Sequence, residues 1–403
     1  MLIEFSVTNF KSIKDNIVFS MEKGEHTRKT SKTQHNVLKV SPNINLLKSA
    51  LIFGANASGK SNFLEALIVL NLLVVTSTET VVDKLDYRGY GNSTEPTQFE
   101  ISFLKNKIEY FYSISYDSTK IFSEVLKEND KVVFDRLTDQ PETLRDNQTL
   151  IYYYQMNNHK AASNAYKWFA EDLIFDHGYI SIPDQILYKK ILDPITKNKF
   201  IKILKKADFN IVDAQLVESP PDKYLLKFAK DNFEDLTRRE QFIKRNQEAT
   251  LVLVHENKEL GNFNLSLKSE SLGTQAAIKF ILTMLSYDSN KVLLFDEFDT
   301  SFHINLSKTF LSLINSEFQK SQFILTTHEP ELMSHNMRKD QIYFMEKDIE
   351  GASTMYSLFD FNQADNRNDG KSYTKKYLAG RFGGLPVIDE EEILEVLGEP
   401  DAI

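Results

Sequence analysis

Residues 51–62 read LIFGANASGKSN, and this stretch decides the fold class. The pattern G-x-x-x-x-G-K-[ST] of a phosphate-wrapping loop is satisfied by Gly54, Gly59, Lys60 and Ser61. The apolar run 49–53 before it predicts a buried parallel strand, and the helix formers of 63–70 predict a helix after it. A strand that turns sharply into a helix points unpaired backbone N–H groups at an anion. The stretch therefore predicts a site for the phosphates of a nucleotide.

Each polar residue of this loop has an expected role. Lys60 is expected to reach the β- and γ-phosphates, and the Ser61 hydroxyl to take one coordination position on Mg²⁺. The expected ligands are therefore ATP and Mg²⁺. The predicted nucleotide-binding residues of the loop are Gly54, Asn56, Ala57, Ser58, Gly59, Lys60, Ser61 and Asn62.

The bulk composition limits the class of protein. A chain of 403 residues, 41% hydrophobic and 26% charged, predicts a globular protein with two lobes or a large insertion. No apolar run approaches the ~18 residues of a membrane helix, and the N-terminus lacks the order of a signal peptide. The absence of cysteine excludes disulfides and fits the cytoplasm. A net charge of −9 argues against a coat of DNA-binding lysines but leaves one basic face open.

Alternating apolar and polar residues mark two antiparallel regions. Residues 2–19 predict two antiparallel strands joined near Lys14, and the runs within 99–134 predict a meander. The first pair is either an ordinary edge hairpin or lies beside the nucleotide, with Lys11 or Lys14 on phosphate or ribose. Gln98 is either a glutamine that senses Mg²⁺ and water or an ordinary polar strand residue. The position of the Q-loop glutamine therefore stays open.

The region 150–206 changes character. Helix formers predict one or two helices over 184–207, broken at Pro194, and the aromatic residues around them predict a helical core rather than a base-stacking platform. From Lys189 to Arg245, fourteen Lys or Arg stand against nine Asp or Glu. This local excess indicates either a contact face for nucleic acid or a partner, or a solvated helix surface.

A second anion-binding pattern occurs at 265–281, LSLKSESLGTQAAIKFI. A strand-like alternation gives way to small residues and a helical run, which again places a helix N-terminus after a loop. One chain rarely needs two such ends for one phosphate chain, so Ser271 and Gly273 are expected to bind the γ-phosphate held by a second copy. The alternative is a helix whose Ser and Thr side chains only cap its own amides.

Two carboxylates close an apolar strand in KVLLFDEFDTS, residues 291–301. Ligands bind at the carboxyl ends of strands in open α/β sheets, so Asp296 is predicted to hold Mg²⁺ and Glu297 to act as general base on the attacking water. Acidic residues at such a position are costly unless a metal or a donor meets them. The turn 299–301 is expected to face the partner copy.

A further buried strand, QFILTTH, ends in His328. A helix over 306–318 would join it to the strand before Asp296 by the right-handed crossover of a parallel sheet. From the end of this strand, His328 is expected to reach the γ-phosphate and to orient water.

The segments GANASGKSN, ESLGTQ, VLLFDEFDTSFH and TTH, in this order, resemble the ABC-type ATPase core of SMC, RecF and OLD proteins. The tail, RKDQIYFMEKDIEGASTMYSLFDF and YTKKYLAGRFGGLP, is similar to a narrower group, the RloA/AbiLii-type abortive-infection ATPases with AriA of the PARIS system. This resemblance implies an α/β P-loop NTPase fold of ABC-ATPase type, with a mixed sheet, an antiparallel β subdomain and a helical insertion. It covers the first ~70 residues and roughly 250–390.

The resemblance also implies residue roles. Lys60 and Ser61 match the Walker A ligands, Asp296 the Walker B aspartate and Glu297 the catalytic glutamate. The signature residues acting in trans and the switch histidine match Ser271, Gly273 and His328; Leu272 stands where the subgroup often has an acidic residue. Such ATPases close ATP between two head-to-tail copies, so a homodimer or a higher homo-oligomer is expected, with a motion suited to gating a partner.

The expected division of the chain follows from these motifs. Residues 1–75 and 248–345 form the two parts of the ATPase core, and the remainder comprises a β subdomain (76–150), a helical insertion (151–247) and a family-specific tail (346–403). OLD proteins append a nuclease domain, but the tail lacks a clear set of metal-binding carboxylates, and Glu390 to Glu392 after Pro386 predict a helix start. A separately encoded effector, RloB-like or a TOPRIM-type nuclease, is therefore expected.

Three functions remain open from the sequence. The first is an ATP-hydrolysing sensor of a phage-defence system that controls the effector. The second is a DNA-binding repair ATPase like RecF, and the third is a scaffold that binds ATP and hardly turns it over. A transporter subunit is disfavoured by the antiparallel insert and the tail.

Overall fold

A central six-stranded sheet carries the phosphate-binding loop. The structure, a computed structural model, describes residues 1–25, 33–176, 184–218, 220–246, 249–259, 261–361, 373–385 and 394. The strand order is β10 (Leu173–Asp176), β14 (Ser289–Phe295), β15 (Lys320–Thr327), β5 (Ser49–Phe53), β16 (Ile342–Lys347) and β17 (Ser353–Ser357). All neighbours are parallel except the β16–β17 pair, which is antiparallel. The sheet confirms the predicted parallel strands at 49–53, 292–295 and 322–328.

The register of this sheet brings three distant motifs to one edge. Phe295 of β14 pairs with Leu325 of β15, and Thr327 of β15 pairs with Phe53 of β5. Because the strands are parallel, their carboxyl ends lie side by side. The residues that follow β14, β15 and β5 are therefore neighbours in space.

A second six-stranded sheet is antiparallel throughout. Its order is β2 (Ile17–Ser20), β1 (Leu2–Thr8), β6 (Thr97–Lys105), β7 (Ile108–Tyr116), β8 (Ile121–Glu128) and β9 (Lys131–Asp135). Both the predicted N-terminal strand pair and the predicted meander are confirmed. The two segments, separated by some eighty residues, complete one sheet through the β1–β6 pairing.

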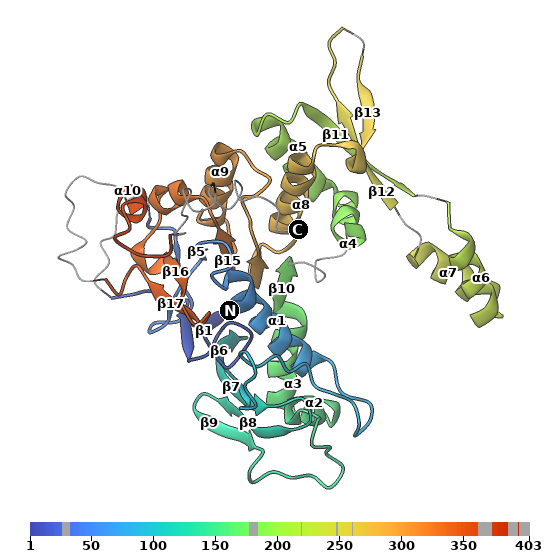
Figure 1. Cartoon of the computed structure of the whole chain (residues 1–403). Helices are drawn as coiled ribbons and strands as arrows, with labels where there is room; N and C mark the ends of the chain where they lie inside the picture. Colours follow the sequence, from blue (N-terminus) through green and yellow to red (C-terminus); the bar gives the residue numbers. More distant parts are fainter. Residues whose placement is uncertain are drawn as a thin grey trace, which may run out of the picture.

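Helix α1 (Lys60–Val75) lies between the two sheets (Figure 1). It is apolar all round, as its sequence predicts, and Phe63, Leu64 and Leu67 are fully buried with residues of β5 and of the antiparallel sheet. Each such side chain contributes about 1.5–3 kcal/mol. The loop before α1 is thereby held on a rigid support.

Aromatic residues after the meander close the same core. Trp168, in a π-helical turn at 168–172, is fully buried and stacks on Phe103 with ring centroids 4.2 Å apart. The short helices α2 (Leu150–Met156) and α3 (Lys160–Lys167) precede this turn. Trp168 and Phe169 are core residues, as predicted, but the core to which they belong is shared with the antiparallel sheet and is not that of a separate helical subdomain.

The other face of the central sheet is covered by a second core. In β5, Ala50 and Ile52 belong to the first core and Leu51 and Phe53 to the second, as the two-residue period of a strand requires. The helices of the second core are α4 (Asp184–Tyr188), α5 (Pro194–Lys206), α8 (Leu272–Ser286) and α9 (Ile304–Ile314). Helix α9 is the predicted connection between β14 and β15.

An arm leaves the body beside α5. It consists of a three-stranded antiparallel sheet, β11 (Ile211–Glu218), β12 (Ala249–His255) and β13 (Phe263–Ser266), and of the helices α6 (Lys223–Asn232) and α7 (Leu236–Asn246), which lie at its end (Figure 1). The helical insertion predicted for 151–247 is thus wrong in part, because it contains the strands β10 and β11. β10 has only four residues, and its pairing with β14 makes it a strand.

The remaining strands and α-helix of the described chain are short. They are β3 (Val37–Lys39) paired with β4 (Asn45–Leu47), and α10 (Tyr373–Leu378). The expected helix start at Glu390 to Glu392 lies outside the described residues. Among the helices that the structure describes, none is both long and apolar enough to cross a membrane.

Candidate nucleotide site

The loop between β5 and α1 is closed around the side chain of Lys60. Lys60 Nζ donates to the carbonyl oxygens of Gly54 and Ala55, each at 2.9 Å, and the residue is only 5% exposed. Gly59, which precedes the helix, has φ +107°, a conformation that favours glycine. The loop therefore has the curled backbone that a phosphate-binding motif requires.

Two opposite effects act on the pKa of Lys60. Burial lowers the pKa of Lys60 to about 8, although Asp296, Glu297 and Asp299 act in the opposite direction and favour its charged form. The carboxylates that follow β14 are thus close enough to Lys60 to interact with it. The structure brings the predicted phosphate ligand and the predicted metal ligand together.

The two acidic residues after β14 are anchored to β15. Thr326 donates its hydroxyl to Asp296 Oδ1, and the backbone N–H of Glu297 donates to Thr326 Oγ1 at 2.7 Å. Glu297 has φ +48°, which costs a residue with a side chain about 1–2 kcal/mol. The hydrogen bonds to Thr326 therefore hold Glu297 in a backbone conformation that is unfavourable for a residue with a side chain.

His328 lies beside the predicted general base. Its Nε2 is 4.0 Å from Glu297 Oε1, and both side chains reach solvent, with 36% and 55% exposure. The sequence predicts that these two residues act on the same water, and the structure places them within reach of one. Solvent can therefore reach the space between these two side chains.

Asp299, in the turn after Glu297, is partly buried. Burial raises the pKa of Asp299, against a hydrogen bond from Thr327 and the nearby His328, which lower it. Within the described chain its Oδ1 atom has no hydrogen-bond partner. The turn thus keeps one carboxylate oxygen available to a group that enters the site.

The back of the loop is packed against two segments that are far apart in the sequence, one near Ser12 and the other in β17. Ser353 Oγ of β17 donates to the Ser58 carbonyl at 2.8 Å and lies 2.7 Å from the hydroxyl of Ser12, which can donate to it. Asn62 Nδ2 donates to Ser12 Oγ at 2.7 Å. A Cβ atom on Gly59 would lie 2.3 Å from Ser353 Oγ. This packing leaves room for a glycine only.

The residues present fit a magnesium nucleotide. Ser58 Oγ is buried and, among the described residues, has no hydrogen-bond partner, which suits a loop built to meet an anion. No group of three or more His, Asp and Glu in the described part of the chain could hold a metal alone. Ser61 and Asp296 would supply two oxygens, and Mg²⁺ commonly takes its remaining ligands from phosphate and water.

The predicted signature residues lie at the start of α8. Ser271 caps the helix and accepts from the backbone N–H of Thr274 at 3.1 Å, so the capping alternative is observed. Leu272 is 77% exposed. A Cβ on Gly273 would lie 2.6 Å from the Ser301 carbonyl oxygen, which gives a packing reason for this glycine. A contact of Ser271 and Gly273 with the nucleotide of a second copy stays a prediction.

The other candidates from the sequence have different surroundings. Lys11 Nζ pairs with Glu65 of α1, and Lys14 Nζ lies 3.4 Å from Glu350, so either lysine would have to exchange an ion pair to bind phosphate. Gln98 lies in β6, where it pairs with Thr8 and its side chain is exposed.

Sequence reasoning missed several contacts in and near the site. It did not assign Thr326, Ser12 or Ser353, and it did not foresee that His255 Nε2 lies 2.6 Å from Glu270 Oε1, just before the signature. The threonine could have been found, because a polar residue in a buried strand needs a partner. The serine pair depends on tertiary packing and had no local signal.

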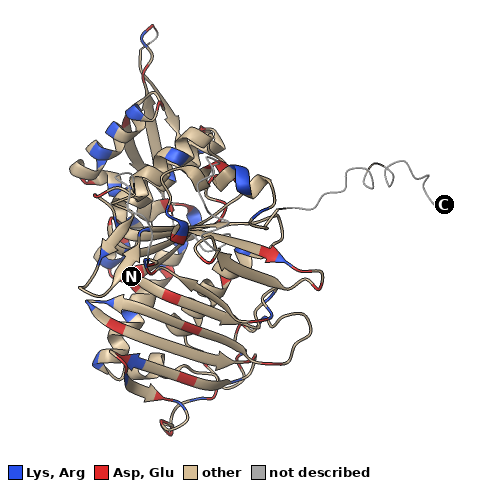
Figure 2. Cartoon of the chain, turned by 90° about the vertical axis from the view of Figure 1, so that its left-hand side faces the viewer, with Lys and Arg blue, Asp and Glu red and all other residues tan. Residues whose placement is uncertain are grey.

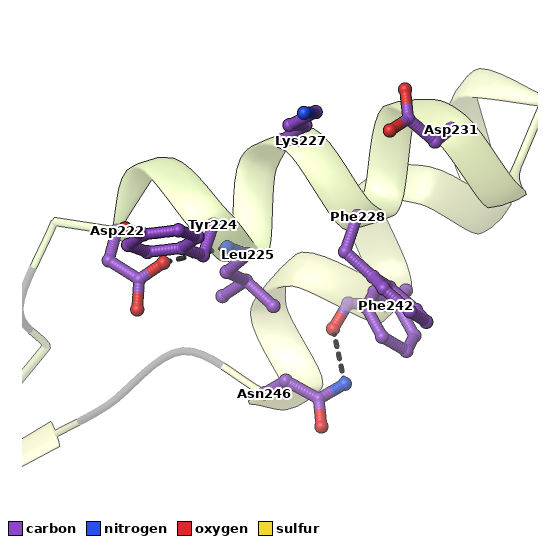
Figure 3. A pocket seen from close by; sticks show the side chains of 8 residues that line it. All are labelled: Asp222, Tyr224, Leu225, Lys227, Phe228, Asp231, Phe242 and Asn246. Carbon is purple, nitrogen blue, oxygen red and sulfur yellow. Dashed lines mark hydrogen bonds between the residues drawn. The ribbon is translucent and has the colours of Figure 1, made fainter.

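A groove lies elsewhere, between α6 and α7 at the end of the arm (Figure 3). It measures about 530 Å³ and combines apolar with charged side chains: Asp222, Tyr224, Leu225, Lys227, Phe228, Asp231, Phe242 and Asn246. None of the predicted nucleotide residues lines it. The groove is therefore separate from the predicted nucleotide site.

The fold and the converging motifs are those of a P-loop NTPase fold of the ABC-ATPase type. Residues 49–334 match the sequence family described as "AAA domain, putative AbiEii toxin, Type IV TA system". The chain belongs to this family. The narrower resemblance to the RloA/AbiLii group stays a prediction. No curated protein matches the chain.

Solved structures of SMC heads are similar to the chain. The SmcHead bound to the C-winged helix domain of ScpA has a TM-score of 0.50 and 14% identity, with 88% of this chain and 97% of that chain covered. The SMC head domain from Thermotoga maritima has a TM-score of 0.42 and 12% identity, covering 88% and 98%. The Pyrococcus furiosus Smc head with an extended coiled coil, bound to the C-terminal domain of ScpA, has 0.44 and 13%, covering 99% of each chain. The first of these likenesses supports the predicted fold.

Proposed function

We propose that this protein binds and hydrolyses ATP with Mg²⁺ between two head-to-tail copies, as the regulatory subunit of a bacterial anti-phage system. In this function the nucleotide state controls a separately encoded toxic effector, an RloB-like or TOPRIM-type nuclease. The observation that carries the ATPase part is the cluster of Lys60 with Asp296, Glu297 and Asp299 at one sheet edge. The family description, which links the domain with a toxin–antitoxin system, supports the defence part.

The roles of the residues follow from their positions. Lys60 and the N–H groups at the start of α1 hold the phosphates, and Ser61 and Asp296 hold Mg²⁺. When bound, Mg²⁺ neutralises charge on the β- and γ-oxygens. Glu297 accepts a proton from the attacking water, and His328 orients this water from the other side, at 4.0 Å from the carboxylate.

The dimer part rests on the exposed start of α8. Ser271 and Gly273 lie on an outward-facing helix end, and the adjacent Leu272 is 77% exposed. A second copy that brought this end over the P-loop would add N–H groups to the γ-phosphate and bury Leu272. Hydrolysis would remove that contact, and the copies would separate.

The decisive experiment uses Glu297→Gln, which keeps the shape of the side chain and removes the base. We expect the variant to bind Mg-ATP, to lose turnover and to accumulate as a dimer in size-exclusion chromatography with light scattering. Lys60→Met should bind no nucleotide and stay monomeric. Lys48→Met is the matched control, because Lys48 is also buried in this fold and also has a pKa lowered by burial to about 8. Unchanged turnover in Glu297→Gln would refute the assignment.

The effector part requires a separate test. Co-expression with the neighbouring open reading frame, followed by a pull-down with and without Mg-ATP, should recover the effector in one nucleotide state. Phage challenge of cells with wild type and Lys60→Met then reports on defence. Full defence by the Lys60→Met variant would show that the nucleotide does not control the effector.

A DNA-binding ATPase is the second candidate, favoured by the basic surface of α5. This helix carries five lysines and no acidic residue, and Figure 2 shows Lys and Arg on helices of the half of the molecule opposite the antiparallel sheet. Binding through such a surface should weaken by orders of magnitude between 50 and 200 mM salt. Absence of binding to duplex DNA at low salt would discard this function.

A further inference from the structure

We propose that Thr326 is the positioning residue for hydrolysis, because its single hydroxyl sets both the metal ligand Asp296 and the general base Glu297. This inference rests on the proposed ATPase function. Thr326 is the last residue but one of β15, the strand next to β14, and it is fully buried. Its hydroxyl contacts Asp296 and Glu297, and we infer that it acts through these two neighbours.

The direction of both hydrogen bonds is fixed by chemistry. An ionised carboxylate can only accept, and a backbone N–H can only donate. The Thr326 hydroxyl therefore gives its one proton to Asp296 Oδ1 and receives the N–H of Glu297 on its oxygen, at 2.7 Å. One oxygen atom thus holds the carboxylate of Asp296 and the backbone of Glu297 at the same time.

The backbone of Thr326 adds a third contact to the same turn. The N–H of Phe298 donates to the Thr326 carbonyl oxygen at 3.1 Å, which fastens the residue after Glu297 to β15. Between these two anchors Glu297 adopts φ +48°. The anchors thus hold the general base in a backbone conformation that directs its side chain toward His328.

The neighbouring threonine serves a different carboxylate. Thr327, also fully buried, hydrogen-bonds Asp299 and accepts the backbone N–H of Glu329 at 3.0 Å. Alternate residues of a strand point to opposite faces, so the two hydroxyls divide the acidic turn between them. The pair of threonines explains why a polar end follows the apolar run 323–325.

Valine would be the expected residue at position 326 on packing alone. It has the shape of threonine, suits a buried strand and needs no hydrogen-bond partner. A buried hydroxyl is retained where its partners require it. The hydroxyl of Thr326 is therefore assigned to the orientation of Asp296 and Glu297 rather than to the core.

The test compares Thr326→Val, which removes the hydroxyl, with Thr326→Ser, which keeps it. We expect Thr326→Val to lower kcat about 10- to 100-fold, as loss of a residue that orients metal ligands does. The half-saturating Mg²⁺ concentration should rise, whereas binding of a fluorescent ATP analogue without Mg²⁺ should not change. Thr326→Ser should restore both values. A merely structural threonine would affect stability without moving the Mg²⁺ requirement.

Two further variants keep the outcomes separate. Thr97→Val removes another fully buried hydroxyl, which donates to the Asn9 carbonyl at 2.7 Å, and should leave kcat unchanged. Thr326→Ala replaces the valine variant if that protein does not fold. If Glu297→Gln stops turnover but Thr326→Val does not, the inference is overturned and the ATPase function stands. If the wild type has no turnover, both are overturned.

Discussion

Replacing Lys60 by methionine should stabilise the protein without nucleotide while it abolishes nucleotide binding. The substitution keeps the aliphatic stem of Lys60, a residue only 5% exposed, and removes the ammonium group, which donates to the loop carbonyls of Gly54 and Ala55. A lysine buried to meet phosphate is costly when no phosphate is present. Binding energy and folding energy are therefore expected to change in opposite directions.

The magnitude follows from the pKa of Lys60. A fall from 10.5 to about 8 corresponds to about 3 kcal/mol of lost stability at neutral pH, at ~1.36 kcal/mol per pH unit. The variant also loses two hydrogen bonds to carbonyl groups, each worth about 1 kcal/mol. The net effect at pH 7 is a gain of about 1 kcal/mol. For 403 residues this raises Tm by about 1 °C.

The sign of the effect should reverse with pH. The pKa of Lys60 is lower in the folded than in the unfolded protein, so between pH 8 and 10.5 the unfolded chain binds more protons. Wild-type stability therefore rises with pH in this window, relative to the variant. Below pH 8 the full cost of the buried charge applies, and above pH 10.5 only the hydrogen-bond loss remains. The variant should be more stable than wild type at pH 7 and less stable at pH 10.

Calorimetric unfolding of both proteins at pH 7, 8.5 and 10 measures this difference, and titration with a fluorescent ATP analogue measures binding. Lys48→Met, at the other end of β5, should show the same pH trend but keep its nucleotide affinity, because the pKa of Lys48 is also lowered by burial to about 8. A stability difference between Lys60→Met and wild type that does not change with pH would refute the reasoning.

Three other substitutions test the support of the site. Gly59→Ala should abolish ATP binding in the same titration, because φ is +107° and the new Cβ would strike the β17 hydroxyl behind the loop. Trp168→Ala should cost about 3–5 kcal/mol in urea unfolding, because it empties the stacking position on Phe103. Glu124→Gln should cost about 3 kcal/mol by the same measurement, since Arg136 then stays buried beside a neutral partner; a loss below 1 kcal/mol would contradict this account.

Local patterns were sufficient to predict the part of the site that lies on consecutive residues. The apolar run before Gly54, the helix formers after Ser61 and the acidic pair that ends a strand each report their own structure. The parallel sheet then follows, because the strands that end before Gly54, at Asp296 and at His328 must bring their carboxyl ends to one edge. Lys60 and Asp296 are accordingly found together.

The remainder depends on contacts between distant segments. Ser12 and Ser353 are 341 residues apart, and nothing in either neighbourhood indicates that they meet behind the loop. β10 has no strand pattern of its own, and its four residues are extended because β14 offers them an edge. The role of Thr326 required the register of β14 against β15. Side-chain pairing across strands is a tertiary property, so residue types alone could not supply it.

The arm has a consequence for how this chain can diversify. Glu218 at the end of β11 is the strand partner of Ala249 at the start of β12. The segment between them therefore leaves the sheet and re-enters it at paired positions. The entropy of closing such an excursion grows only with the logarithm of its length. Homologues could therefore lengthen, shorten or exchange residues 219–248 without disturbing the sheet edge that carries Lys60 and Asp296, and this segment could change independently of the proposed nucleotide site.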